Sequence, residues 1–269
     1  MPTTHSLNLH EFSRVTGLSV AAAERYFACG ILPQIGVEQK IRANQISCGR
    51  LVFRLLQQGF SHEMITRILS IISDSTDCFA TLSQRLPEMQ RLFSNDPGGS
   101  EKLATLIKKE DDIRTELLAN KMMIETKTAP AILAACIRFS GNAHDTGLCL
   151  GILNRKMAGN IAGKPFCLFY DAGILPGKSD IEACIPVHKN IAADAVIVRE
   201  IPEMTGFAIH FSGSYELSGR AYERLFTHFS SQQIEYKLPF CETYIKGSGM
   251  AMQGNPASQK TEIFIPIAE

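Results

Sequence analysis

Eight cysteines are the residues of this chain best suited to bind a soft metal ion or to undergo redox chemistry. They stand at positions 29, 48, 78, 136, 149, 167, 184 and 241. Zinc and iron–sulfur sites usually show short spacings between their ligands, and the chain has no CxxC pair. Thiols scattered in this way are mostly small buried hydrophobes. We therefore expect no metal site and no cofactor.

The histidines show no arrangement suited to nucleophilic catalysis. His144, His188, His210 and His228 are scattered along the second half of the chain, and the sequence adds no recognisable pair of a nucleophile and a base. A glutamate in a ligand groove could still act as a general base. We expect a protein that is not an enzyme, with a small-molecule hydrolase as the alternative.

The length of 269 residues indicates two domains. Hydrophobic residues make up 45% and charged residues 20% of the chain, as in ordinary globular proteins. We expect a cytoplasmic protein without membrane contact, because neither a membrane span nor the apolar core of a signal peptide is recognisable. The net charge is zero, but residues 1–75 carry seven Lys and Arg against five Asp and Glu. This slight positive excess permits DNA binding.

A helix-turn-helix is predicted near the N-terminus. Residues 9–16 and 20–29 each have the pattern of a short amphipathic helix. Gly17 separates the two segments, and Ser19 is a suitable N-cap for the second helix. Two helices joined by a tight turn that contains glycine are typical of this motif.

Further segments complete a predicted winged domain over residues 1–75. Val37 and Ile41 bound a short segment with strand-like positions, which could form a small wing. Two more helices follow, and Ser61 is a suitable N-cap for the last of them. The sequence SNDPGGS at residues 94–100 then breaks the helical pattern.

A long helix with a heptad pattern is expected after this break. Its two series of residues spaced by seven are Leu103, Glu110, Leu117 and Ile124, and Leu106, Ile113 and Asn120. Such a pattern is typical of a coiled-coil seam. We expect residues 76–122 to form a linker and dimerisation helix, with a homodimer through residues 100–122. The alternative is a helix packed on its own domain.

Residues 123–269 contain an internal repeat of strand-like segments. PAILAACIRFSG at 130–141 aligns with PEMTGFAIHFSG at 202–213, and EACIPV at 182–187 aligns with EIFIPI at 262–267. The offsets are 72 and 80 residues, and the two matches occur in the same order. Strands with two intervening helices indicate an α+β domain. Duplicated halves of this kind usually meet about a pseudo-two-fold axis, and their junction forms a natural cleft.

Four short motifs occur in the first domain: TGLSV at 16–20, RYF at 25–27, GILP at 30–33 and QGFS at 58–61. Through them the first 75 residues resemble the MerR family of transcription regulators. The resemblance implies a winged helix-turn-helix that binds an operator and distorts a promoter so that RNA polymerase can use it. It also implies DNA contacts by Ser19, Arg25, Tyr26, Lys40, Arg42 and Arg54.

Two positions of the recognition helix depart from the MerR pattern. The family usually carries basic residues where this chain has Ala21 and Glu24. Lysine and arginine raise DNA affinity by neutralising phosphates, and these two residues remove that contribution. Glu24 could instead accept a hydrogen bond from a cytosine amino group. A ligand-binding protein with a degenerate DNA-binding head is therefore a further alternative.

Three motifs of the C-terminal half, FSGSYE at 211–216, ETY at 242–244 and KTEIFIPI at 260–267, add to the duplicated architecture. Together they resemble the GyrI-like effector-binding domain of multidrug-responsive regulators of the BmrR type. In that family a groove between the two halves takes flat, often cationic aromatic compounds. The fold class is then α + (α+β): a winged helix-turn-helix, a long helix and a GyrI-like domain over residues 123–269.

The resemblance implies a buried carboxylate and aromatic walls in this groove, because a cationic aromatic ligand needs apolar faces and a countercharge. Glu242, beside Tyr244, is the first choice for the carboxylate, and Glu182 and Glu262 are the second choices. The candidate wall residues are Phe166, Tyr170, Phe211, Tyr215 and Tyr244. The expected function is a DNA-binding transcription regulator that responds to a small-molecule effector.

Overall fold

The computed structural model divides the chain into two compact units, Met1–Ala119 and Asn120–Glu269. The first unit includes both the predicted DNA-binding domain and the predicted long helix. Within the part of the chain that the structure describes, no helix is long and apolar enough to cross a membrane. The described residues are 7–33, 41, 43–72, 77–93, 97–142, 145–175, 179–246 and 259–268.

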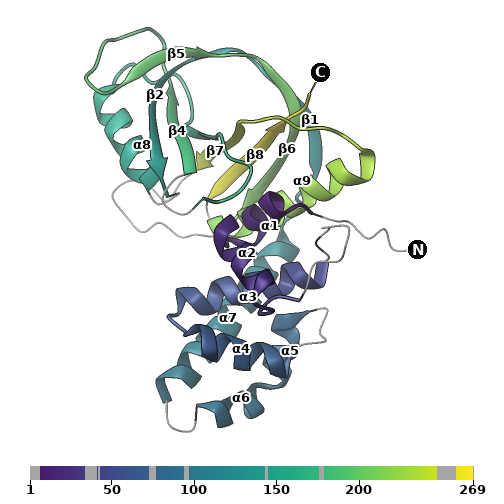
Figure 1. The fold of residues 1–269 in the computed structure, drawn as a ribbon. Coiled ribbons are helices and arrows are strands. Elements are labelled where there is room, and N and C mark those ends of the chain that lie inside the picture. The colour runs from purple at the N-terminus through teal and green to yellow at the C-terminus, as the bar shows by residue number, and fades with distance from the viewer. Residues whose placement is uncertain are drawn as a thin grey trace. The chain divides into compact units, whose positions relative to one another are not determined.

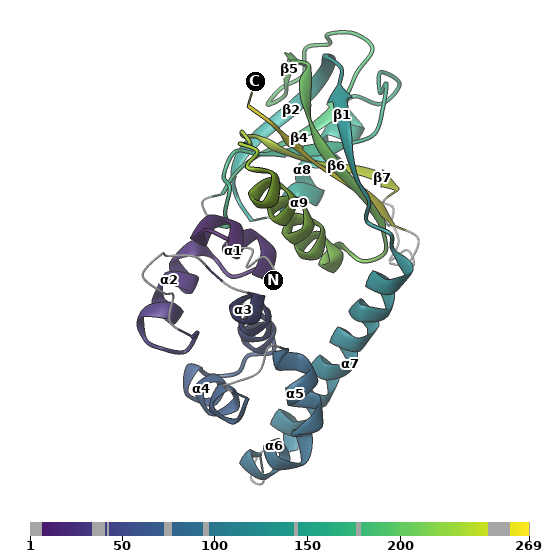
Figure 2. The ribbon, with the colours of Figure 1, turned by 90° about the vertical axis from the view of Figure 1, so that its right-hand side faces the viewer.

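Helices dominate the described part of the first unit (Figure 1). In chain order they are α1 (Leu9–Thr16), α2 (Val20–Ala28), α3 (Ala43–Gln57), α4 (His62–Ile71), α5 (Cys78–Gln84), α6 (Leu86–Leu92) and α7 (Pro97–Ala119). Helix α3 contacts α1, α4, α5 and α7, and Figure 2 shows it between the α1–α2 pair and α7. The unit is therefore a helical assembly built around α3.

A tight turn at Gly17 joins α1 to α2, at the position that the sequence predicts. The Ser19 side chain accepts a hydrogen bond from the Ala22 N–H and so caps α2. Gly17 has a φ of 89°, and a Cβ atom there would lie 2.7 Å from the Phe53 ring. Glycine is therefore required at this turn, both for its backbone conformation and for the close approach of α3.

The predicted wing lies outside the described residues. These residues are 34–40 and 42, and they include the predicted DNA contacts Lys40 and Arg42. Ile41 is described, and it pairs with Leu7 in an isolated antiparallel bridge. The two helices and their turn are thus observed, whereas the wing remains a prediction.

The heptad face of α7 packs inside its own unit, which corrects its interpretation as a dimer seam. Leu103, Leu106 and Ile113 are buried, and so is the polar residue Glu110. Helix α7 contacts α3, α5 and α6, and Glu110 pairs with Arg114 one turn further on. The apolar periodicity therefore serves the core of the unit. A homodimer through residues 100–122 would have to use other side chains.

A disulfide joins Cys48 of α3 to Cys78 of α5, with Cα atoms 5.6 Å apart. The sequence pattern suggests buried single thiols at these positions, and this expectation is wrong for the pair. The two residues are 30 positions apart along the chain, so only the packing of α3 against α5 brings them together.

The second unit is built on an eight-stranded sheet with the order β1-β6-β8-β7-β3-β4-β2-β5. All neighbouring strands are antiparallel, and Figure 1 shows the sheet curling between its edges. The strands are β1 (Ile124–Ala129), β2 (Ile132–Gly141), β3 (Phe166–Phe169), β4 (Ser179–Pro186), β5 (Ile197–Ile201), β6 (Met204–Ser212), β7 (Phe240–Lys246) and β8 (Lys260–Pro266). The helices are α8 (Asp145–Lys156), η1 (Tyr215–Leu217) and α9 (Ser218–Gln232).

The strand order is symmetrical about the β3–β7 pair. Reading the order from either end exchanges β1 with β5, β6 with β2, β8 with β4 and β7 with β3. The repeat offset of 72 residues relates β2 to β6, and the offset of 80 relates β4 to β8. The duplication read from the sequence is therefore a structural duplication, with a pseudo-two-fold axis between β3 and β7.

The two faces of the sheet have different surroundings. Paired residues on neighbouring strands share a face, and successive residues alternate. Glu242 pairs with Cys167 and accepts a hydrogen bond from Tyr222 of α9, while Cys149 of α8 lies near Cys167. Both helices therefore cover this side, which we call the helix face. The opposite side, the inner face of the curled sheet, carries residues such as Cys136 and its paired neighbours.

Asn120, the first residue of the second unit, is fixed to strand β6. Its side-chain amide donates a hydrogen bond to the Ser212 carbonyl and accepts one from the Ser212 N–H, both at 2.7 Å. The side chain thus pairs with Ser212 as a backbone strand neighbour would. It extends the antiparallel pairing of β1 with β6 beyond the start of β1.

Candidate effector pocket

The structure separates the eight predicted pocket residues into two groups on opposite faces of the sheet. Glu242, Tyr244, Phe211 and Tyr215 belong to the helix face, and Phe166, Tyr170, Glu182 and Glu262 belong to the inner face. A single pocket cannot include both groups, because the sheet itself lies between them. The first-choice carboxylate and the two second-choice carboxylates therefore have different surroundings.

The helix-face group is centred on Glu242 of β7. Tyr222 of α9 donates a hydrogen bond from its hydroxyl to the Glu242 carboxylate at 2.8 Å. The rings of Tyr215 and Tyr244 meet edge to face, with centroids 5.7 Å apart and an interplanar angle of 85°. Tyr222 is 1% exposed, whereas Tyr215 is 42% exposed. The group thus reaches from the buried interior to the surface of the unit.

The surroundings of Tyr215 and Tyr244 favour the neutral form of both side chains. Burial raises the pKa of Tyr244 well above its ordinary value, and the neighbouring Cys167 and Glu242 add to the effect. Burial also raises the pKa of Tyr215, again assisted by Glu242. Neutral phenol rings beside a carboxylate offer both aromatic faces and negative charge, which is the combination that a cationic aromatic molecule requires.

Tyr222 is a member of this group that the sequence reasoning missed. It lies on the buried face of α9 together with Leu225, Phe226 and Phe229, and it stacks on Phe226 with ring centroids 5.9 Å apart. In the sequence this spacing indicates only a core position. Nothing in the pattern distinguishes the one aromatic side chain whose hydroxyl reaches the sheet.

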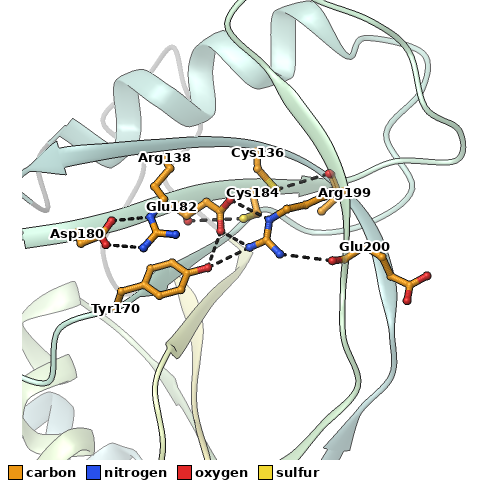
Figure 3. Close-up of polar contacts among 9 residues, drawn as sticks. Cys136, Arg138, Tyr170, Asp180, Glu182, Cys184, Arg199 and Glu200 are labelled. Carbon is orange, nitrogen blue, oxygen red and sulfur yellow. Dashed lines mark hydrogen bonds and ion pairs between the residues drawn. The ribbon is translucent and has the colours of Figure 1, made fainter.

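Glu182, on the inner face, is held by partners from within the chain (Figure 3). Its carboxylate accepts hydrogen bonds from Arg199 Nε at 3.1 Å and Nη2 at 2.5 Å, and from the Tyr170 hydroxyl at 2.8 Å. Burial works to raise the pKa of Glu182, but the bonds from Arg199 and Tyr170 outweigh it and hold the pKa below its ordinary value. Arg138 lies over the Tyr170 ring, 3.9 Å from its centroid.

The second repeat holds an equivalent ion pair on a buried glutamate. Lys127 Nζ donates to both oxygens of Glu262 at 2.6 Å, and His210 Nε2 lies 3.1 Å from the same carboxylate. Lys127 is paired with Gly206 and Arg199 with Ala134, and these partners are related by the offset of 72. In each half of the sheet, a cationic side chain of the edge strand therefore pairs with the glutamate that occupies the same position in both repeats.

These ion pairs make Glu182 and Glu262 candidates for a structural role. A buried carboxylate with a close cationic partner is already neutralised, so an organic effector cation, which meets no further anionic group there, would have to displace that partner. Glu242, which accepts a hydrogen bond from the Tyr222 hydroxyl, lies on the same face as the paired rings of Tyr215 and Tyr244. The helix-face group thus brings a carboxylate and aromatic rings together and is the candidate effector pocket.

The predicted DNA contacts on α2 differ in their exposure. Ala21, Glu24 and Arg25 are exposed on this helix, and Arg25 lies over the Tyr26 ring. Tyr26 itself is 1% exposed, and its hydroxyl lies 3.1 Å from His62 Nδ1. Tyr26 therefore belongs to the core of the unit, which argues against the predicted contact with DNA.

The two remaining described candidates are Ser19 and Arg54. The Ser19 side chain is engaged in capping α2, and Arg54 is partly buried near the end of α3. The surface that α2 presents thus carries the acidic Glu24 beside the basic Arg25, as the sequence indicates.

Comparisons with known proteins give a likeness of fold. No family model matches the sequence, and no curated protein matches it. Among solved structures, the EcmrR–DNA complex in EcmrR-RPo is similar over 98% of this chain and 100% of that chain, with 19% identity and a TM-score of 0.49. The EcmrR C-terminal domain is similar over 55% of this chain and 99% of that chain, with 21% identity and a TM-score of 0.49. A hydrolase from Listeria innocua is similar over 58% of this chain and 97% of that chain, with 9% identity and a TM-score of 0.41. At these values the likeness does not decide the function.

Proposed function

We propose that this chain is a DNA-binding transcription regulator of the MerR type that responds to a small cationic aromatic effector. The observation that carries the proposal is the helix-face group, in which Glu242 is surrounded by Tyr215, Tyr222 and Tyr244. Glu242 and Tyr244 of this group lie on β7, one of the two central strands at the junction of the repeats. Glu242 pairs there with Cys167 of β3, which belongs to the other repeat, so a ligand at Glu242 is close to both halves of the domain.

The chemistry of the group favours a cation with an aromatic body. A phenol ring attracts a cation placed over its face, and a carboxylate in a partly desolvated site supplies the countercharge. The aromatic faces of Tyr215 and Tyr244 bury the apolar part of the ligand. The proposed pocket therefore contains Glu242, Tyr215 and Tyr244 as contact residues, and the buried Tyr222 holds Glu242 from α9. Phe211 is buried on the same face of the sheet.

Regulation requires that the effector bind one state of the protein better than another. We expect a homodimer, because a two-fold protein fits a pseudo-palindromic operator with one α1–α2 motif on each half-site. The effector would then change how the two motifs hold the operator, and RNA polymerase would respond to the altered promoter.

Binding of the fluorescent cation rhodamine 6G to the full-length chain tests the pocket. Replacing the carboxylate in Glu242→Gln keeps the shape of the side chain and removes its charge, so we expect binding to weaken about tenfold or more. Glu203→Gln is the matched control, because Glu203 is an exposed carboxylate in the turn between β5 and β6. Equal losses in the two variants, or none, would place the dye elsewhere. Recovery of chemically unchanged dye would exclude the hydrolase alternative for this compound.

The same protein, incubated with DNA from the region upstream of its own gene, tests the regulatory part. We expect a retarded complex at moderate salt whose affinity changes when rhodamine 6G is added. Absence of a complex would contradict the proposal. If a complex forms only with the Ala21→Arg/Glu24→Arg variant, the head is degenerate and the chain is a ligand-binding protein. The two added arginines should then account for about two units of the slope of log affinity against log salt concentration.

A further inference from the structure

A compact set of soft-metal ligands lies on the inner face of the sheet, away from the proposed effector pocket. Cys136 of β2 pairs directly with Cys184 of β4, and both thiols point to the same face (Figure 3). The carboxylate of Glu182 lies beside them, and the three ligand atoms are all within 4.8 Å of one another. The three residues are buried, with Cys136 1%, Cys184 0% and Glu182 4% exposed.

We propose that Cys136, Cys184 and Glu182 form a binding site for a thiophilic divalent cation of the zinc and cadmium class. Two thiolates and a carboxylate are a donor set that this class of ion prefers. Two Zn–S bonds of about 2.3 Å at a tetrahedral angle would place the sulfur atoms about 3.8 Å apart. The ligand atoms, all within 4.8 Å of one another, are thus close enough for small side-chain rotations to bring them to one ion.

The charges around the site balance when such an ion is bound. Two thiolates and the carboxylate of Glu182 carry three negative charges, and a divalent cation together with the Arg199 guanidinium carries three positive charges. The two thiols release their protons to solvent as the ion binds. Arg199 Nε donates to Glu182 Oε1 at 3.1 Å and Nη2 donates to Oε2 at 2.5 Å. An ion at Oε1 would therefore replace the longer of the two bonds, while Nη2 keeps its bond to Oε2.

The second repeat shows that the ion pair alone does not require thiols. Its equivalent of Glu182 is Glu262, and the positions that match Cys136 and Cys184 are Ala208 and Phe264. These two also pair directly across β6 and β8. The same framework therefore folds around a buried glutamate and its cation with an alanine and a phenylalanine in place of the cysteines. Only the first repeat of the described sheet adds two sulfur ligands to the glutamate.

Titration of the reduced full-length protein with cadmium chloride tests this site. Cadmium is a suitable probe because its bonds to thiolates give an ultraviolet charge-transfer band, which carboxylates and histidines do not produce. We expect about one cadmium ion per chain with this band, and loss of the band in the Cys136→Ala/Cys184→Ser variant. In Glu182→Gln the band should remain while affinity falls about tenfold or more.

Two control variants separate this site from the other cysteines. Cys149→Ser removes a half-exposed thiol on α8, and Cys48→Ser/Cys78→Ser removes the pair in the first unit. Both should keep the band at full strength. Wild-type protein without a band, or a band of equal strength in the Cys136→Ala/Cys184→Ser variant, overturns the proposal. If that double variant does not fold, Cys136→Ala alone decides, because the second repeat already carries alanine at the equivalent position.

Discussion

Three buried or half-buried glutamates of the second unit differ in the partners that hold them. Glu182 and Glu262 each accept hydrogen bonds from a cationic side chain of an edge strand, whereas Glu242 accepts one from the hydroxyl of Tyr222. A hydroxyl orients a carboxylate without cancelling its charge. The Tyr222 hydroxyl is therefore expected to matter for the binding of a cation without being a contact residue itself.

The variant Tyr222→Phe tests this positioning role at the scale of a single atom. Loss of one hydrogen bond to a charged group corresponds to about 1.5 kcal/mol, so we expect rhodamine 6G binding to weaken by roughly tenfold. Tyr236→Phe is the matched control, because the Tyr236 ring packs in the same aromatic cluster against Phe226 and Phe240. Fluorescence anisotropy gives both affinities. Equal affinities in the two variants would show that the hydroxyl does not position Glu242.

At the residue scale the sequence predicted part of the candidate site. The motif around Glu242 and Tyr244 indicated a carboxylate and an aromatic wall, and the structure places these two side chains on one face. Tyr222 could not be found in this way, because its helical spacing is that of any core residue. Cys136 and Cys184 are 48 positions apart in the sequence, and only the register of β2 with β4 makes them neighbours.

At the element scale, α5 is a short helix tied to both of its larger neighbours. Cys78 links it to α3 through the disulfide. Asp77 caps it by accepting a hydrogen bond from the Ala80 N–H, and the same carboxylate accepts two bonds from Arg114 of α7, at 2.7 and 3.0 Å. Burial works to raise the pKa of Asp77, but the bonds from Arg114 and the backbone prevail and lower it.

The lowered pKa of Asp77 predicts a dependence of stability on pH. A carboxylate whose pKa is depressed on folding stabilises the protein above its unfolded-state value of 3.8, and this contribution is lost as the pH falls through the folded-state pKa. We expect Asp77→Asn to lower the free energy of unfolding by about 1 kcal/mol at neutral pH, and the difference from wild type to shrink below pH 3.8. Urea unfolding at several pH values measures it.

The exposed Asp111 of α7 provides the control for this experiment. Asp111→Asn should change the free energy of unfolding by a few tenths of a kcal/mol at most. A difference between Asp77→Asn and wild type that stays constant as the medium is acidified would contradict the assigned role of the carboxylate.

The helices of the first unit illustrate which elements a sequence can predict. Caps and glycines lie next to the residues they affect, so the turn at Gly17 and the start of α2 after Ser19 were predicted correctly. The heptad series of α7 was assigned to the wrong partner. A period of 3.5 residues predicts an apolar stripe, but whether that stripe packs on α3 and α5 or on a second chain depends on contacts distant in sequence.

At the scale of the whole molecule, the buried stripe of α7 limits how a homodimer could form through residues 100–122. The apolar side chains Leu103, Leu106 and Ile113 are already covered. Leu118, near the end of the helix, is 89% exposed. A dimer contact in this segment is therefore expected to include Leu118.

The variant Leu118→Glu tests this contact. A charge in the centre of an apolar contact opposes association, so we expect the dimer dissociation constant to rise about tenfold or more in analytical ultracentrifugation. Lys102→Glu, at an exposed position of the same helix, is the control and should leave the dimer unchanged. A dimer of undiminished strength in the Leu118→Glu variant would place the contact outside this part of α7.

The fixing of Asn120 to β6 has a consequence for the freedom of the chain after α7. Helix α7 ends at Ala119, and the next residue is held to Ser212 by two hydrogen bonds of 2.7 Å. A linker of many residues would leave many backbone torsions free between α7 and the sheet. Here one peptide bond joins Ala119 to a residue whose side chain is held by β6, so the chain offers very few free torsions at this point.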